Sequence, residues 1–236
     1  MASAFGTQVL GTVVLWTLSG TIAVAVAMVL AALSMGRQRV IRLFADALIT
    51  FTRGVPTSLL VVGAGIGAMA RPAPTWLVNV FPGTSPGLTL VAWAVTIALA
   101  FGSTGHLAII FRTGYASLGA ARLEQATLLG LTPTRRFALL LRESATATSA
   151  PLGARLVHHL HNTAFAALFP VADFFGWIQQ RANETFEVSR YAAIGVAVYV
   201  VLSLLIWAMF RGLELWLGIP TRRRTRPAGQ LGPVIT

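Results

Sequence analysis

Ionisable side chains are scarce in this sequence, and five of them lie inside long apolar runs. These five are His106, Arg155, His158, His159 and His161. A titratable group is costly to bury in an apolar segment of membrane length, so such a residue is a functional candidate by default. The chemistry open to them is hydrogen bonding to a polar ligand, proton transfer or metal ligation. Arg155 lies near the start of its run, where we expect its long side chain to snorkel toward water.

Two arrangements of these residues could support other chemistry. Ser103 and His106 share a helical face, and a serine–histidine pair would suit an intramembrane hydrolase, although such enzymes usually place the pair on different helices. His158 and His161 stand three residues apart and could ligate a metal, but no carboxylate or cysteine joins them. We therefore assign no catalytic residue and no metal site, and keep the Ser103 and His106 hydrolase as an alternative.

The composition excludes several functions directly. All 18 basic residues are arginine, and the chain has neither lysine nor cysteine. Without lysine there is no Walker A phosphate loop and no Schiff base. Without cysteine there is no disulfide framework and no thiol nucleophile. A process driven by ATP must therefore bind its nucleotide on another chain.

The overall composition is that of a membrane protein. Hydrophobic residues make up 56% of the chain and charged residues 11%, against roughly 25% charged in soluble domains. The mean hydropathy is +0.74. A net charge of +11 could suggest a nucleic-acid partner, but the apolar fraction fits that interpretation poorly. The sequence predicts an all-α, multi-pass membrane protein with one domain over residues 1–236 and no nucleic-acid partner.

Five apolar runs reach membrane length, which is about 20 residues for a helix. They are residues 9–35, 54–70, 88–111, 151–172 and 191–210. A long arginine-rich loop, residues 113–149, joins the third run to the fourth, and a basic tail follows at residues 218–236. An odd number of spans places the two termini on opposite sides of the membrane.

The arginines sort to one side of this topology. With the N-terminus outside, the inner segments hold 14 arginines against four acidic residues, a net of +10, and the outer loops are neutral. Cytoplasmic loops carry the excess of basic residues in membrane proteins. We therefore expect the N-terminus outside, the C-terminus inside and residues 113–149 in the cytoplasm.

The cytoplasmic loop has the pattern of two helices separated by a tight turn. Residues 116–129 read as a helix, and Gly130 suits the left-handed position just after a helix end. Thr132 then suits an N-cap, and Pro133 suits the first position of the next helix. Such an element either connects two spans or docks on a cytoplasmic partner.

Four motifs in order give the chain a family resemblance. Residues 124–130 follow the Glu-Ala-Ala-x-x-x-Gly signature of ABC importer permeases. Residues 53–56 resemble the Arg-Gly-x-Pro stretch of the polar amino acid permeases, of the histidine and glutamine type. Residues 151–153 and 161–165 resemble the family's Pro-Leu-Gly and Lys-Asp-Thr-Ser-Leu segments at the same spacing, and residues 211–214 resemble its Arg-x-Leu-Glu end. The resemblance covers roughly residues 10–217.

The resemblance implies a type I ABC importer permease fold with five transmembrane helices and a cytoplasmic coupling helix. Glu124, Gln125, Ala126 and Gly130 would form the part of the coupling helix that contacts the ATPase. Gln125 departs from the signature, which has alanine there. ATP and Mg²⁺ would bind the partner ATPase and not this chain, which would carry no enzymatic activity.

The same resemblance implies partners and a location. They are ABC ATPase subunits, a second permease copy or a homologous permease, an extracytoplasmic substrate-binding protein, an amino acid substrate and membrane lipid. The location implied is the bacterial cytoplasmic membrane. A stand-alone channel, which would conduct without ATP, remains a weaker alternative to the importer.

Polar positions in the third and fourth spans face the amino acid in that family. The matching positions here are His106 to Ile109 and His161 to Thr163, which give the candidates His106, His161, Asn162 and Thr163. Arg155 in the fourth span is a further candidate that the family pattern does not supply. Many members carry an acidic residue where Ile109 stands, and aspartate or another polar residue where Asn162 stands. Without those carboxylates a cationic amino acid has no obvious counter-charge, so we expect a neutral or acidic substrate. The pocket could instead belong to a paired, non-identical permease.

Overall fold

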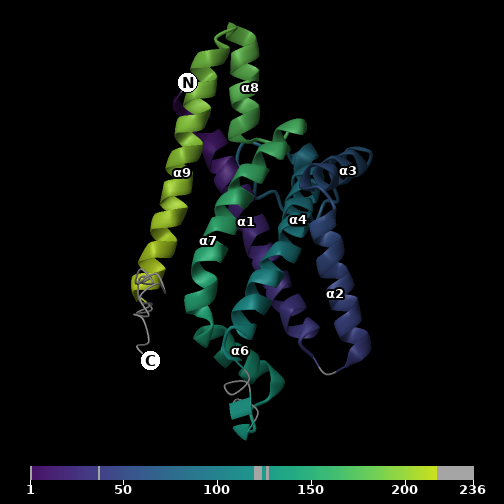
Figure 1. The fold of residues 1–236 in the computed structure, drawn as a ribbon. Helices are drawn as coiled ribbons and strands as arrows, with labels where there is room; N and C mark the ends of the chain where they lie inside the picture. Colours follow the sequence, from purple (N-terminus) through teal and green to yellow (C-terminus); the bar gives the residue numbers. More distant parts are fainter. Residues whose placement is uncertain (1, 37, 120–123, 126–127, 217–236) are drawn as a thin grey trace, which may run out of the picture.

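The computed structural model describes residues 2–36, 38–119, 124–125 and 128–216, and the described part is a bundle of helices without strands (Figure 1). The α-helices are α1 (Ala2–Ser34), α2 (Arg39–Gly54), α3 (Thr57–Met69), α4 (Thr89–Ala116), α6 (Pro133–Glu143), α7 (Ala145–Asn162), α8 (Phe174–Thr185) and α9 (Val188–Trp216). Two 3-10 helices join them, η1 (Pro86–Leu88) and η2 (Thr163–Leu168). The start of α1 and the end of α9 lie toward opposite ends of the bundle, and α6 lies at the end away from the α8–α9 hairpin (Figure 1).

Three stretches of helix are long and apolar enough to cross a membrane on their own. They are Ala4–Ser34, Pro86–Ala116 and Val188–Trp216. The pair α2 and α3 passes the same test together, as one span bent by 92°. The predicted span at residues 151–172 is divided, because α7 ends at Asn162 and η2 continues the chain. The described residues thus contain three or four of the five expected spans, and the five-span topology and the orientation stay predictions.

The bend between α2 and α3 follows from the Arg-Gly-x-Pro motif. Proline disfavours a helical conformation in the residue before it, and Val55 is accordingly extended, with φ −90° and ψ 125°. Pro56 stands at the N-cap of α3 and Gly54 is the last residue of α2. The sequence placed only residues 54–70 in the second span, whereas in the structure α2 supplies a further helix of 16 residues before it.

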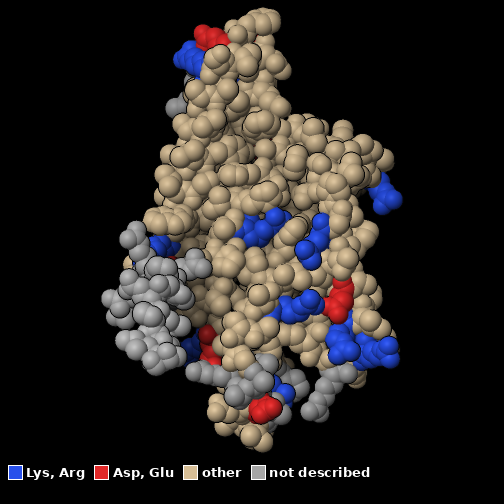
Figure 2. All heavy atoms as spheres, viewed as in Figure 1, with Lys and Arg blue, Asp and Glu red and all other residues tan. Residues whose placement is uncertain are grey.

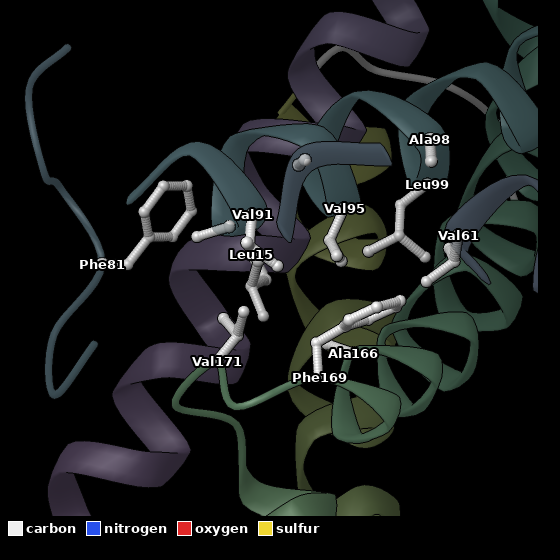
Figure 3. Close-up of a cluster of buried hydrophobic side chains, with 12 residues drawn as sticks. Leu15, Val61, Phe81, Val91, Val95, Ala98, Leu99, Ala166, Phe169 and Val171 are labelled. Atoms are coloured by element: carbon white, nitrogen blue, oxygen red, sulfur yellow. The ribbon is translucent and has the colours of Figure 1, made fainter. Parts of the chain in front are cut away.

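The core is built around α4, which packs on α1, α2, α3 and α7. Figure 3 shows one cluster of buried side chains, in which Leu15, Val95 and Leu99 lie near Phe169. A second cluster joins the latter part of α1 to α2 and α4 and contains three fully buried alanines, Ala23, Ala27 and Ala31. Small residues let membrane helices approach closely. Such close packing is expected in a membrane, because lipid tails are as apolar as the side chains and leave little hydrophobic driving force for helix association.

The extended segment after η2 packs against α3 through one glycine. A Cβ added at Gly65 would collide with the ring of Phe169, whereas one added at Gly63 or Gly67 meets open space. Gly65 is buried and the other two glycines are exposed. Only Gly65 therefore provides the close contact that holds Phe169 in the core.

The surface of the molecule combines apolar helix faces with a charge asymmetry. On α9, large apolar side chains such as Val196, Leu204 and Trp207 are 58–65% exposed. Exposed apolar side chains on a long helix fit a lipid-facing surface. On the face drawn in Figure 2, most basic side chains lie in the middle and lower parts of the view. The lower part holds α6 in Figure 1.

An ion pair of 2.7 Å between Asp46 and Arg112 joins α2 to α4.

Candidate functional site

Three buried polar side chains meet where α1, α4 and α7 pack together. His159 on α7 is fully buried, and both of its ring nitrogens have partners. Its Nε2 lies 2.8 Å from the hydroxyl of Ser19 on α1, and its Nδ1 lies 2.7 Å from the hydroxyl of Ser103 on α4. We call Ser19, Ser103, Arg155 and His159 the interior polar cluster.

The hydrogen bonds of the cluster are all consistent with an imidazole that carries its proton on Nε2. The Ser19 hydroxyl donates to the carbonyl of Leu15 at 2.5 Å, so its oxygen accepts from the imidazole Nε2–H. A neutral imidazole with that proton accepts at Nδ1, and there the Ser103 hydroxyl donates. The Ser103 oxygen in turn accepts from the Arg155 guanidinium at 3.3 Å. The cluster is therefore a continuous chain of donors and acceptors across three helices.

Arg155 supplies the only fixed charge of this cluster. Its Nη2 donates to the carbonyl of Gly102 at 3.2 Å as well as to Ser103, and its Nε is buried with no hydrogen-bond partner among the described residues. No described carboxylate forms an ion pair with it. The Arg155 guanidinium turns toward α4 while its side chain stays partly exposed, so the expectation that it would snorkel toward water stays a prediction.

The remaining path candidates lie in different places. His106 is half-buried on α4, and the Ser103 hydroxyl bonds to His159 instead of to His106. His161 is exposed and its Nε2 lies 3.2 Å from the Ser203 hydroxyl on α9. A step of two residues rotates a helix by roughly 200°, so His161 faces away from the side of α7 that carries His159.

The last two candidates lie where α7 meets η2. Asn162 and Thr163 are buried, and the Thr163 hydroxyl donates to the carbonyl of Leu160 at 2.7 Å. His161 lines an apolar cavity of about 340 Å³ between the end of α7, α8 and α9. The structure thus brings Arg155 into the interior with His159 and leaves His161 outside it. Within the described residues, no three of His, Asp and Glu gather as metal ligands would.

Sequence reasoning assigned no role to Ser19, considered Ser103 only with His106 in the hydrolase alternative, and counted His159 only as one member of a histidine run. The signal for Ser19 was weak, because one serine in a long apolar helix is ordinary. His159 follows Arg155 by four residues, which places the two on one helical face. That spacing was the available sign that they act together.

The loop over residues 113–149 has the predicted turn. Gly130 is left-handed, with φ +64°, and α6 begins at Pro133. The backbone N–H of Arg135 donates to the Thr132 hydroxyl at 3.4 Å, a weak N-cap contact. Glu124, Gln125 and Gly130 are exposed, whereas Ala126 lies outside the described residues. The exposed turn therefore leaves three of the four signature positions accessible to a partner.

Comparison with solved structures shows the fold of an ABC transporter permease. One similar chain belongs to a crystal structure of an amino acid ABC transporter with histidines, with a TM-score of 0.72, 21% identity and coverage of 91% of this chain and 94% of that chain. Another belongs to an inward-facing structure of the MetNI methionine ABC transporter, in the CY5 native crystal form, with a TM-score of 0.66, 16% identity and coverage of 94% and 96%. No family model and no curated protein matches the sequence.

Proposed function

We propose that this chain is the membrane-spanning permease subunit of an ATP-driven ABC importer for an amino acid. The observation that carries the proposal is structural similarity over nearly the full length of both compared chains. One of those chains belongs to an amino acid transporter and the other to a methionine transporter. The chain would form the translocation path and would carry no enzymatic activity of its own.

The interior polar cluster supports a neutral or acidic amino acid as the substrate. Arg155 is a half-buried cation without a described carboxylate partner, and an unpaired charge that is partly withdrawn from water is costly. A substrate carboxylate that reaches this guanidinium would supply the missing counter-charge and accept a charge-assisted hydrogen bond. A second cation brought into the same interior would be repelled. His106 on the same helix as Ser103 would add a neutral hydrogen-bonding group.

The partners follow from what the chain lacks. It has no lysine for a phosphate-binding loop, so ATP and Mg²⁺ would bind a separate ATPase. The turn at Gly130 and the signature residues before it would dock on that ATPase. The path would be enclosed with a second permease copy or a homologous permease, and an extracytoplasmic binding protein would deliver the amino acid. The complex would lie in the bacterial cytoplasmic membrane.

Transport would proceed by alternating access. ATP binding would shift the equilibrium between two arrangements of the spans, because the closed ATPase pair would favour one of them. The coupling loop would carry that preference to α4 and α7, which flank it in the chain. Since α4 and α7 also carry Ser103, Arg155 and His159, their relative movement would change the interior polar cluster directly.

Substitutions at Gly130 test the docking role. A β-branched residue is strongly disfavoured at positive φ, whereas asparagine tolerates it, so Gly130→Val should disrupt the turn and Gly130→Asn should keep it. Left-handed strain costs an L-residue about 1–2 kcal/mol, which corresponds to a roughly tenfold weaker association with the ATPase. The measurement is co-purification of the ATPase and ATP-dependent uptake at equal amounts of membrane-inserted permease. If Gly130→Val matches the unmodified chain in both, the loop does not dock the ATPase.

A further inference from the structure

A second polar site lies beside the start of α8, at the end of the bundle away from α6 (Figure 1). A cavity of about 290 Å³ is lined there by side chains that include Gln8, Asp173, Trp177 and Gln180. A water molecule takes roughly 30 Å³ of liquid volume, so the cavity has room for a small organic group. The walls come from α1, the loop before η1, the segment after η2 and α8.

The walls of this cavity are held in place by hydrogen bonds from distant parts of the chain. The backbone N–H of Ala172 donates to the Thr84 hydroxyl at 3.0 Å, and the N–H of Phe174 donates to the Thr12 hydroxyl at 2.9 Å. The carbonyl of Ala172 packs so closely on Gly11 that a Cβ there would collide with it. The segment that carries Asp173 is therefore positioned before any ligand arrives.

The hydrogen bonding around Asp173 is unbalanced. One carboxylate oxygen, Oδ2, accepts from the N–H groups of Phe175 and Gly176 at 2.8 and 3.1 Å and caps α8. The other oxygen, Oδ1, is buried and has no partner among the described residues. Asp173 as a whole is only 2% exposed. The backbone N–H of Trp177 donates to the carbonyl of Asp173, whereas its indole N–H is buried without a partner among the described residues. Pro170 has no backbone N–H to offer. The site thus presents an unused acceptor and few free backbone donors.

No described basic side chain neutralises this carboxylate. The nearest arginine on α8, Arg181, forms an ion pair of 2.9 Å with Glu184 and lies over the ring of Trp177, 5.9 Å from its centroid. A buried carboxylate without a cation is unfavourable, and a ligand cation with N–H donors would relieve that cost. An uncharged donor would supply a hydrogen bond but no counter-charge, and an anionic ligand would be repelled.

We propose that the cavity at Asp173 binds an ammonium or guanidinium group, with the free carboxylate oxygen of Asp173 as its acceptor. Trp177 also lines the cavity, so its ring reports on what binds there. Binding requires a small opening of the wall, because Oδ1 is shielded from solvent in the empty cavity. This site goes beyond the proposed transport function and stands whether or not the chain is an importer.

The ionisation of Asp173 supports this assignment. Burial raises the pKa of Asp173 to about 7, against the lowering effect of the two backbone N–H bonds. A bound cation favours the ionised form of a nearby carboxylate. Ligand binding and ionisation of Asp173 therefore reinforce each other near neutral pH.

The cationic group has two possible sources with the same chemistry. It is either the ammonium of a free small molecule, such as an amino acid, or a lysine or arginine side chain of a protein that docks on this end of the bundle. Both would place N–H donors against Asp173. They differ in whether the group is free or carried on a polypeptide.

The test uses the full-length chain in detergent, labelled with 5-fluorotryptophan, and follows the ¹⁹F resonance assigned to Trp177. Methylammonium should shift that resonance saturably, and tetramethylammonium, which has the same charge and no N–H, should not. Asp173→Asn keeps a cap for α8 but removes the charge, and we expect at least tenfold weaker binding. Glu187→Gln, which removes an exposed carboxylate paired with Arg190, is the matched control and should bind normally.

Two further ligands separate the sources. Saturation by free L-alanine indicates a small-molecule site, and saturation by N-acetyl-lysine methylamide indicates a site for a protein side chain; either result supports the proposal. Equal shifts with methylammonium and tetramethylammonium, or unchanged binding in Asp173→Asn, would overturn it. The comparison of methylammonium with tetramethylammonium on the unmodified chain tests the proposal even if the Asp173→Asn variant does not fold.

Discussion

His159 is the residue on which the interior polar cluster depends. It is the one member bonded to both other helices, through the hydroxyls of Ser19 and Ser103. Its neighbour His158 is exposed on the same helix and is absent from this network. Of these two adjacent histidines, one is buried and hydrogen-bonded and the other is exposed, so variants of the two can be compared directly.

His159→Leu should lower the free energy of unfolding by about 1–3 kcal/mol, because two buried hydroxyls lose their partner. His158→Leu should change it by less than about 0.5 kcal/mol, since the side chain is exposed. Thermal denaturation in detergent measures both variants under the same conditions. Equal effects for the two leucine variants would show that the cluster does not stabilise the contact between α1, α4 and α7.

At the scale of elements, the contact between α3 and the segment after η2 rests on Gly65. Gly65→Ala should destabilise the protein by about 1–3 kcal/mol, because its Cβ would collide with the Phe169 ring. Gly63→Ala should be neutral or stabilising by up to about 1 kcal/mol, because it adds helix propensity in open space. Denaturation of both variants in detergent gives the comparison.

A double variant separates this contact from a general effect of the substitution. Phe169→Ala removes the ring that Gly65→Ala would strike, so the cost of the pair should be smaller than the sum of the two single costs. Strict additivity of the two costs would mean that Gly65 and Phe169 do not touch.

The elements also show what the sequence could and could not predict. The turn at Gly130 and the start of α6 at Pro133 were predictable, because both depend on residues next to each other in the chain. The turn of the Arg155 guanidinium toward α4 was not, because it depends on which helix faces it. The division of the fourth span into α7 and η2 was also missed, because no proline or glycine stands near the break after Asn162.

At the scale of the whole molecule, the arginines and the apolar helices together suit an asymmetric membrane protein. The sequence predicted an all-helical bundle, and the structure confirms it for the described residues. The fold comparison supports a permease of the ABC type. The count of five spans and the orientation remain predictions, because length and composition identify three spans and one bent pair within the described residues.

The most direct test of the account is amino acid uptake by the purified complex. The complex is isolated through a tag on this chain, reconstituted into proteoliposomes with ATP on the ATPase side, and offered a panel of amino acids with the binding protein present. We predict uptake of a neutral or acidic amino acid that requires ATP hydrolysis and stops with a non-hydrolysable analogue. Uptake at the same rate without ATP would contradict the importer, and high-affinity uptake of arginine would contradict the role given to Arg155.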